Sequence, residues 1–138
     1  MLAVLLSGCG GGGGSGGTTP TPTPSAKPPT IDNAMLNPAF VQYLGGNVII
    51  SAKVVDMDGT VSTVTARVTL GSSSKSVTLT GSSGIYTGSF AAPANSSGTD
   101  QVYTVTITAT DNAGLSSSSP GFNFTVKASV SPPAPPPL

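Results

Sequence analysis

The segment 101–114, QVYTVTITATDNAG, limits the folds open to this sequence more than any other stretch. Every second residue from Tyr103 to Ala109 is apolar, and the residues between them are threonines. A period of two places these sets on opposite faces of a β-strand, one buried and one exposed. Asp111-Asn112-Ala113-Gly114 then supplies residue types that form tight turns. The segment therefore predicts a central strand that leads into a hairpin.

The same alternation recurs along the rest of the central part of the chain, where no amphipathic helix is indicated. We expect further strands at 30–33 and 40–43 (one edge strand broken at Asn37-Pro38), 47–55, 61–70, 76–80, 85–90 and 122–127. We expect 71–74 to be a loop. About seven short antiparallel strands in roughly a hundred residues predict an all-β, immunoglobulin-like β-sandwich.

Four motifs in this region resemble those of bacterial immunoglobulin-like or fibronectin-III-like extracellular domains. They are PPTI at 28–31, VVDMDG at 54–59, YTGSF at 86–90 and TATDNAG at 108–114. Because the chain has one cysteine and no tryptophan, the resemblance implies a disulfide-free sandwich held by apolar packing. It also implies that Tyr103 plays the part of a tyrosine corner.

The N-terminus carries a second resemblance, because Leu6-Ser7-Gly8-Cys9 is similar to the lipobox of bacterial lipoproteins. The resemblance implies a cleaved signal peptide and a lipidated, palmitate-bearing Cys9, hence a membrane anchor in the bacterial cell envelope that faces the periplasm or the cell surface. At roughly 0.8 kcal/mol per buried CH₂, two or three acyl chains anchor a protein stably. Residues 1–8 are short for a signal peptide and lack a basic start, so we expect Met1 to lie inside a longer one.

Four regions follow from these boundaries: a partial signal peptide (1–8), a lipidated cysteine with a tether (9–29), the sandwich (30–128) and a proline-rich tail (129–138). The tether is almost pure glycine at 10–17 and rich in Thr-Pro at 18–29. Such compositions bury too little apolar surface to fold, so we expect disordered N- and C-terminal tails.

The amino-acid composition argues against several classes of function. Charged residues make up 7% of the chain and the formal net charge is +0, so no basic patch is indicated and no nucleic-acid partner is expected. The chain has no histidine, which removes Ser-His-Asp triads and His-ligated zinc. We therefore expect a non-enzymatic protein without catalytic residues.

One group of side chains is a candidate metal site. In an immunoglobulin-like topology the first strand's start, the connection after 55 and the hairpin after 110 meet at one pole. That arrangement gathers Asp32, Asp56, Asp58, Asp111 and Asn112. Their oxygens are the ligand type of Ca²⁺, the one cofactor that the sequence suggests, although the bidentate glutamate of a calcium loop is missing. The alternative is ordinary turn chemistry, in which these side chains cap their own backbone.

Taken together, the sequence predicts a non-enzymatic, lipid-anchored module of the bacterial cell envelope that acts in adhesion, protein interaction or structural display. The alternatives are a Ca²⁺-dependent or glycan-binding module, or a fragment of a larger multidomain surface protein. For glycan binding, Phe40 and Tyr43 are the aromatic residues that alternation does not assign to the core. The sequence does not identify the protein or glycan partner.

Overall fold

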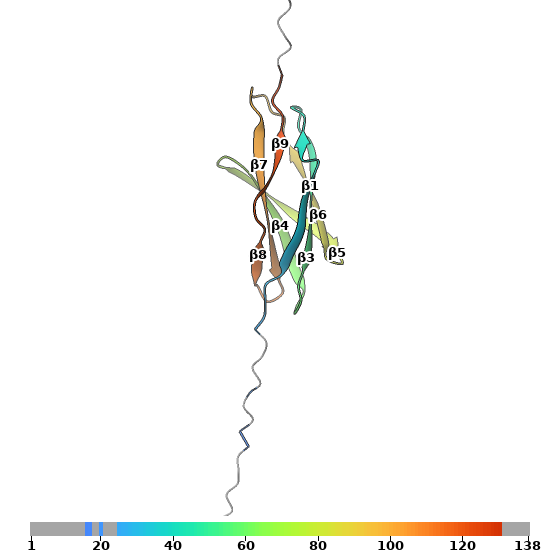
Figure 1. The fold of residues 1–138 in the computed structure, drawn as a ribbon, viewed down its shortest axis with the longest axis vertical. Helices are drawn as coiled ribbons and strands as arrows, with labels where there is room; N and C mark the ends of the chain where they lie inside the picture. Colours follow the sequence, from blue (N-terminus) through green and yellow to red (C-terminus); the bar gives the residue numbers. More distant parts are fainter. Residues whose placement is uncertain (1–15, 18–19, 21–24, 131–138) are drawn as a thin grey trace, which may run out of the picture.

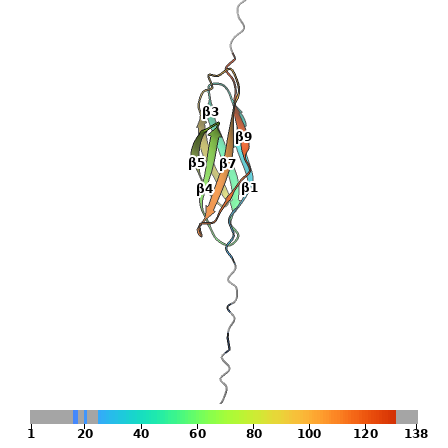
Figure 2. The same ribbon diagram turned by 90° about the vertical axis from the view of Figure 1, so that its left-hand side faces the viewer.

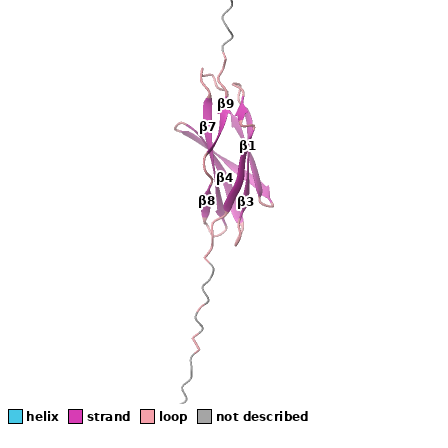
Figure 3. Ribbon diagram, in the orientation of Figure 1, coloured by secondary structure: helices cyan, strands magenta, loops and turns pink. Residues whose placement is uncertain are grey.

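The computed structural model describes residues 16–17, 20 and 25–130, and these form strands, turns and loops (Figure 3). The predicted lipobox, Cys9, most of the tether and the end of the proline-rich tail lie outside the described residues. In the part that is described, no helix is long and apolar enough to cross a membrane. The strands are β1 (Thr30–Asn37), β2 (Phe40–Val41), β3 (Gly46–Val55), β4 (Val61–Leu70), β5 (Ser73–Ser82), β6 (Ile85–Ala92), β7 (Gln101–Asp111), β8 (Ser116–Ser118) and β9 (Phe122–Val126).

The strands form two packed sheets that β5 joins into one hydrogen-bonded path, so the predicted all-β sandwich is confirmed (Figures 1 and 2). One sheet has the order β1-β3-β6, and the other has the order β4-β7-β9-β2, with β8 paired to the far end of β7. Their pairings are antiparallel, except that β2 runs parallel to β9. The parallel pair differs from the predicted all-antiparallel arrangement, and it arises because β2 and β9 both run toward the same pole.

Strand β5 links the two sheets because it pairs with a different neighbour along each part of its length. Residues Ser73 to Leu79 pair with β4, whereas Thr80 to Ser82 pair with β6. Gly81 lies where β5 meets β6, and a Cβ at that position would be 1.8 Å from the carbonyl oxygen of Ile85. Only glycine allows the two backbones to approach so closely.

The core consists of the apolar faces that alternation predicts on β3, β4, β7 and β9. Along β7, Val105, Ile107 and Ala109 are each fully buried. Three aromatic rings fill one end of the core: the ring of Tyr103 stacks on Phe124 with centroids 4.8 Å apart, and Phe90 lies 5.8 Å from each of them. Such clusters contribute a large part of the apolar burial that stabilises a domain of this size.

Two parts of the strand prediction are wrong. The stretch expected as a loop contains the start of β5 at Ser73, because the serines pair with the end of β4. Strand β8 was not expected either, because its three serines lack an alternating pattern. It forms through pairing with β7, where Thr108 and Thr110 share hydroxyl hydrogen bonds with Ser118 (2.9 Å) and Ser116 (2.7 Å). Tertiary pairing thus overrides weak local propensity.

The chain enters and leaves the sandwich at opposite poles. The segment 25–29 reaches β1 at the lower pole of Figure 1, and the chain continues beyond β9 at the upper pole.

At the upper pole the connection between β6 and β7 is fixed by Asn95, which is 1% exposed. Its Nδ2 lies 2.8 Å from the carbonyl oxygen of Thr99 and 3.1 Å from those of Val126 and Lys127. One buried amide therefore joins this connection to the end of β9.

Candidate functional site

The side chains predicted to gather at one pole lie on two connections, 56–60 after β3 and 111–115 after β7, which we call the aspartate pole. Asp56 organises the first connection, since its Oδ1 accepts hydrogen bonds from the backbone N–H groups of Asp58 (3.2 Å) and Gly59 (3.0 Å). This is the turn-capping geometry given above as the alternative to a metal site.

Asn112 joins the two connections. Its Oδ1 accepts a hydrogen bond from the N–H of Thr60 (3.1 Å), and its own N–H donates to the carbonyl oxygen of Thr60 (3.0 Å). Gly59 lies between the side chains, because a Cβ there would be 2.7 Å from Asn112 Oδ1 and 2.8 Å from Asp56 Oδ2. The two oxygens therefore flank one glycine, in the space that a larger residue would occupy.

The remaining aspartates have other partners. Asp111 is 4% exposed, and its Oδ1 accepts from the N–H groups of Ala113 (2.7 Å) and Leu115 (2.8 Å) within its own hairpin. Asp58 Oδ2 accepts from the backbone N–H of Lys27 at 3.0 Å, which holds the entering chain against the pole. Asp32 is exposed on β1, opposite Lys53. The structure thus joins Asp56, Asp58 and Asn112 in one network, with Asp111 in the adjoining hairpin.

This donor set is incomplete as a metal site. Within residues 16–17, 20 and 25–130, no three or more His, Cys, Asp or Glu side chains lie close enough together to hold a metal ion. One oxygen nevertheless has no protein partner, because Asp56 Oδ2 is buried without a hydrogen bond to the described residues. Beside it a cavity of about 400 Å³ is lined by Thr60, Val61 and Tyr86 among others. The Ca²⁺ site stays a prediction.

The residues suggested for glycan contact are exposed. Phe40 is 54% and Tyr43 is 40% exposed, close together in sequence around β2. Phe40 pairs with Thr125 of β9, and Thr125 pairs with Val102 of β7, which is 50% exposed. Phe40, Thr125 and Val102 therefore form a row across the outer face of one sheet, and glycan binding there stays a prediction.

Charge at the upper pole is concentrated in one ion pair. The Lys127 ammonium lies 3.0 Å from Asp100 Oδ2, and the N–H of Ala128 donates to Asp100 Oδ1 at 2.7 Å. The hydrogen bond from Ala128, followed by the one from Lys127, lowers the pKa of Asp100. Both groups are exposed, so the pair contributes little to stability and fixes the exit of the chain.

The role of Asn95 was not expected from the sequence, although a signal is present. The residues Asn95-Ser96-Ser97 are typical of an Asx turn, and Asn95 Oδ1 accepts a hydrogen bond from the Ser97 N–H at 2.9 Å.

The tyrosine-corner role implied for Tyr103 is not observed, because its hydroxyl forms no hydrogen bond with the residues described.

Comparison with protein-family models and with curated proteins finds no match to this chain. Among solved structures, part of a cycloalternan-degrading enzyme from Trueperella pyogenes is similar, with a TM-score of 0.52 and 18% identity. The match covers 68% of this chain and 12% of the enzyme, so the chain corresponds to a small part of that protein. An engineered protein aligns at 22% identity with a TM-score of 0.46, over 77% of this chain and 21% of that one. At such identities the similarity to the enzyme shows the fold alone.

Proposed function

We propose that the chain is a non-enzymatic, lipid-anchored immunoglobulin-like module of the bacterial cell envelope that acts in structural display, adhesion or protein interaction. The observation that carries the proposal is that the chain enters the sandwich through 25–29 and leaves it through 127–130 at opposite poles (Figure 1). A domain tethered through Pro28-Pro29 at one pole holds its other pole and both sheet faces away from the anchor.

The composition of the surface supports the same function. The outward faces of β4 and β7 carry mainly threonine. The sequence lacks histidine, and no serine or threonine in it has a histidine base to activate it. A hydroxyl-rich, nearly uncharged sandwich on a tether is suited to presenting a surface.

The anchor is tested by expressing the full chain, behind a complete lipoprotein signal peptide, in a bacterium fed an alkyne analogue of palmitate. We expect a labelled band in the membrane fraction, and loss of both label and membrane association in Cys9→Ser. Ser15→Thr, which lies outside the Leu6-Ser7-Gly8-Cys9 motif and keeps the cysteine, serves as the matched control. An unlabelled, soluble wild-type chain would contradict the anchor. Protease treatment of intact cells then separates display at the surface from a periplasmic location.

A second candidate, Ca²⁺ binding at the aspartate pole, is favoured by the buried, unpartnered Asp56 Oδ2 beside Asn112 Oδ1. Asp56, Asp58 and Asn112 would hold the ion. Water would fill the remaining positions of its shell of about 6–8 oxygen ligands. Thermal melts with millimolar Ca²⁺ and with EDTA test it. A midpoint raised by Ca²⁺ in wild type and unchanged in Asp56→Asn supports the site, and equal midpoints in wild type remove it.

A further inference from the structure

One strand edge of the sandwich is long, regular and open. It is the side of β5 that faces away from β4 between Ser73 and Thr78, which we call the β5 edge. The edges of β1, β2 and β8 are interrupted or short: β1 has a bulge between Asp32 and Met35, where Asn33 has a φ of 48°, and β2 and β8 have two and three residues. Strand β5 pairs with β4 without any shift of register. An unbroken edge of this kind can accept a further strand.

The backbone groups on the β5 edge follow from the turn that precedes it. Leu70 and Ser73 close a two-residue turn between β4 and β5, so Ser73 and every second residue after it bond to β4. Successive residues of an antiparallel strand direct their N–H and C=O groups to alternate sides. Ser74, Ser76 and Thr78 therefore direct theirs away from β4.

The next members of this series show what such groups do when a strand lies beside them, because Thr80 and Ser82 pair with β6. Before residue 80 the two strands diverge, and no described strand pairs with β5 on this side. Strand β6 is still close to Thr78, whose carbonyl oxygen would be 3.0 Å from a Cβ at Gly88. Nearer the turn, residues 73–76 are exposed, and the tip of the β4–β5 hairpin stands apart from the other strands in Figure 1. Residues 74 and 76 thus offer an open row of donors and acceptors.

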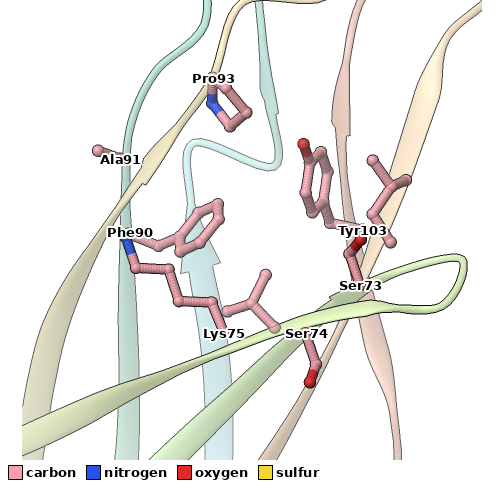
Figure 4. Close-up of a pocket in the computed structure, with 9 residues that line it drawn as sticks. Ser73, Ser74, Lys75, Phe90, Ala91, Pro93 and Tyr103 are labelled. Carbon is pink, nitrogen blue, oxygen red and sulfur yellow. The ribbon is translucent and has the colours of Figure 1, made fainter.

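A second cavity, of about 430 Å³, opens between the β5 edge and the later part of β6 (Figure 4). Its walls are largely apolar and include Val68, Leu70, Phe90 and Pro93. A strand added beside β5 turns every second side chain to the core-facing side of the sheet. Those side chains would enter this cavity, so the edge fits a strand with apolar residues at alternate positions.

The charges at the β5 edge have one sign on both faces of the sheet. Arg67 pairs with Ser76 on the outer face, and its Nη2 donates to Ser74 Oγ at 3.3 Å. Lys75 lies on the opposite side and extends along the cavity toward Phe90 (Figure 4). Strands β4 and β5 contain no acidic residue. An acidic strand complements this edge, whereas a second copy of β5 would place two Lys75 ammonium groups on one face of the joint sheet.

We propose that the β5 edge binds an extended acidic segment of a partner protein, which adds to the sheet as an antiparallel strand. Its residues opposite Ser74 and Ser76 exchange backbone hydrogen bonds with them and carry acidic side chains beside Arg67. The residues between these are apolar and enter the cavity. The proposal names a partner for the interaction role proposed above and rests on that role, but it requires neither the lipid anchor nor the Ca²⁺ site.

The probe is an acetylated and amidated hexapeptide of alternating glutamate and valine, titrated into the ¹⁵N-labelled full chain at neutral pH and low salt. We expect saturable amide shifts around Arg67, Ser74 and Ser76. Arg67→Gln should weaken binding about threefold, because an exposed charge pair is lost. Lys53→Gln, an exposed lysine on β3 of the other sheet, is the matched control and should bind as wild type. A peptide with glutamine in place of glutamate should bind several times more weakly.

Backbone pairing is tested by N-methylation of the peptide. In the proposed register the glutamate N–H groups face β5 and the valine N–H groups face away. Methylating the glutamate nitrogens should abolish binding, and methylating the valine nitrogens should leave most of it. Ser76→Pro removes the N–H on the protein side, at an edge position where proline is tolerated, and should also abolish binding. Thermal melts establish that the variant is folded, and if it is not, the two methylated peptides decide.

Absence of saturable shifts in wild type at millimolar peptide would overturn the proposal. Equal affinity for the two methylated peptides, or for the glutamate and glutamine peptides, would overturn it as well. Shifts at Ser74 and Ser76 that depend on protein concentration without peptide would assign the edge to a second copy instead. Palmitate labelling of Cys9 reports on the anchor alone, so its failure and the failure of strand addition are distinguishable.

Discussion

Asn112 and Thr60 exchange two hydrogen bonds across the aspartate pole, one through the asparagine side chain (3.1 Å) and one between backbones (3.0 Å). The residues are 52 positions apart in sequence, so the contact closes a long loop between β4 and β7 at their shared end. A contact that closes a long loop restricts the conformational freedom of the chain most in segments that local structure does not already fix.

Asn112→Ala removes the acceptor for the Thr60 N–H and should lower the free energy of unfolding by about 1 kcal/mol. The backbone bond between the two residues remains, which limits the loss. Urea denaturation measures the change. Asn123→Ala, an exposed asparagine on β9, is the control and should stay within about 0.5 kcal/mol of wild type. Equal losses in both variants would show that the contact contributes nothing.

Gly81→Ala should be among the most damaging single changes of a glycine to alanine. The added Cβ would lie 1.8 Å from the Ile85 carbonyl oxygen, so the backbones of β5 and β6 must separate. Overpacking of this kind costs about 2–3 kcal/mol. Gly98→Ala has open space around its Cβ and should leave the urea midpoint nearly unchanged. A well-tolerated Gly81→Ala would mean that β5 does not approach β6 in this way.

Asn95→Asp should destabilise the domain by about 3 kcal/mol, because a carboxylate would face the three carbonyl oxygens that the amide now serves. The deficit should shrink in acid, where the introduced carboxyl is protonated and can donate. Asn47→Asp, at an exposed position, controls for the added charge. A loss independent of pH would point to a cause other than carboxylate burial.

Tyr103 should make stability depend on alkaline pH. Burial raises its pKa in the folded state, so its contribution is fully present below the unfolded pKa of about 10 and is lost as pH rises through the higher folded value. Tyr103→Phe should remove this part of the alkaline loss. Urea midpoints measured from neutral to alkaline pH test it, and parallel pH curves for the two proteins would contradict it.

Alternation predicted the sandwich because the sheets bury one face of each strand, as the fully buried Val48, Ile50 and Val105 show. It did not predict β8 or the start of β5, since their serines acquire a strand conformation only by pairing with β7 and β4. At the aspartate pole, turn chemistry located Asp56 and Asn112. The cavity near Lys75 was not expected, because its opening depends on where β5 leaves one sheet for the other.

The parallel pair of β2 and β9 has a mechanical consequence. Thr125 N–H donates to the Ala39 carbonyl oxygen at 3.1 Å, and Lys127 N–H donates to that of Val41 at 2.9 Å. Because the chain enters and leaves the sandwich at opposite poles, tension pulls these strands past each other along their length. The two bonds, running across that direction, are then strained together and must rupture together. We therefore expect the sandwich to resist a force applied along its strands far better than a force that separates the strands one hydrogen bond at a time.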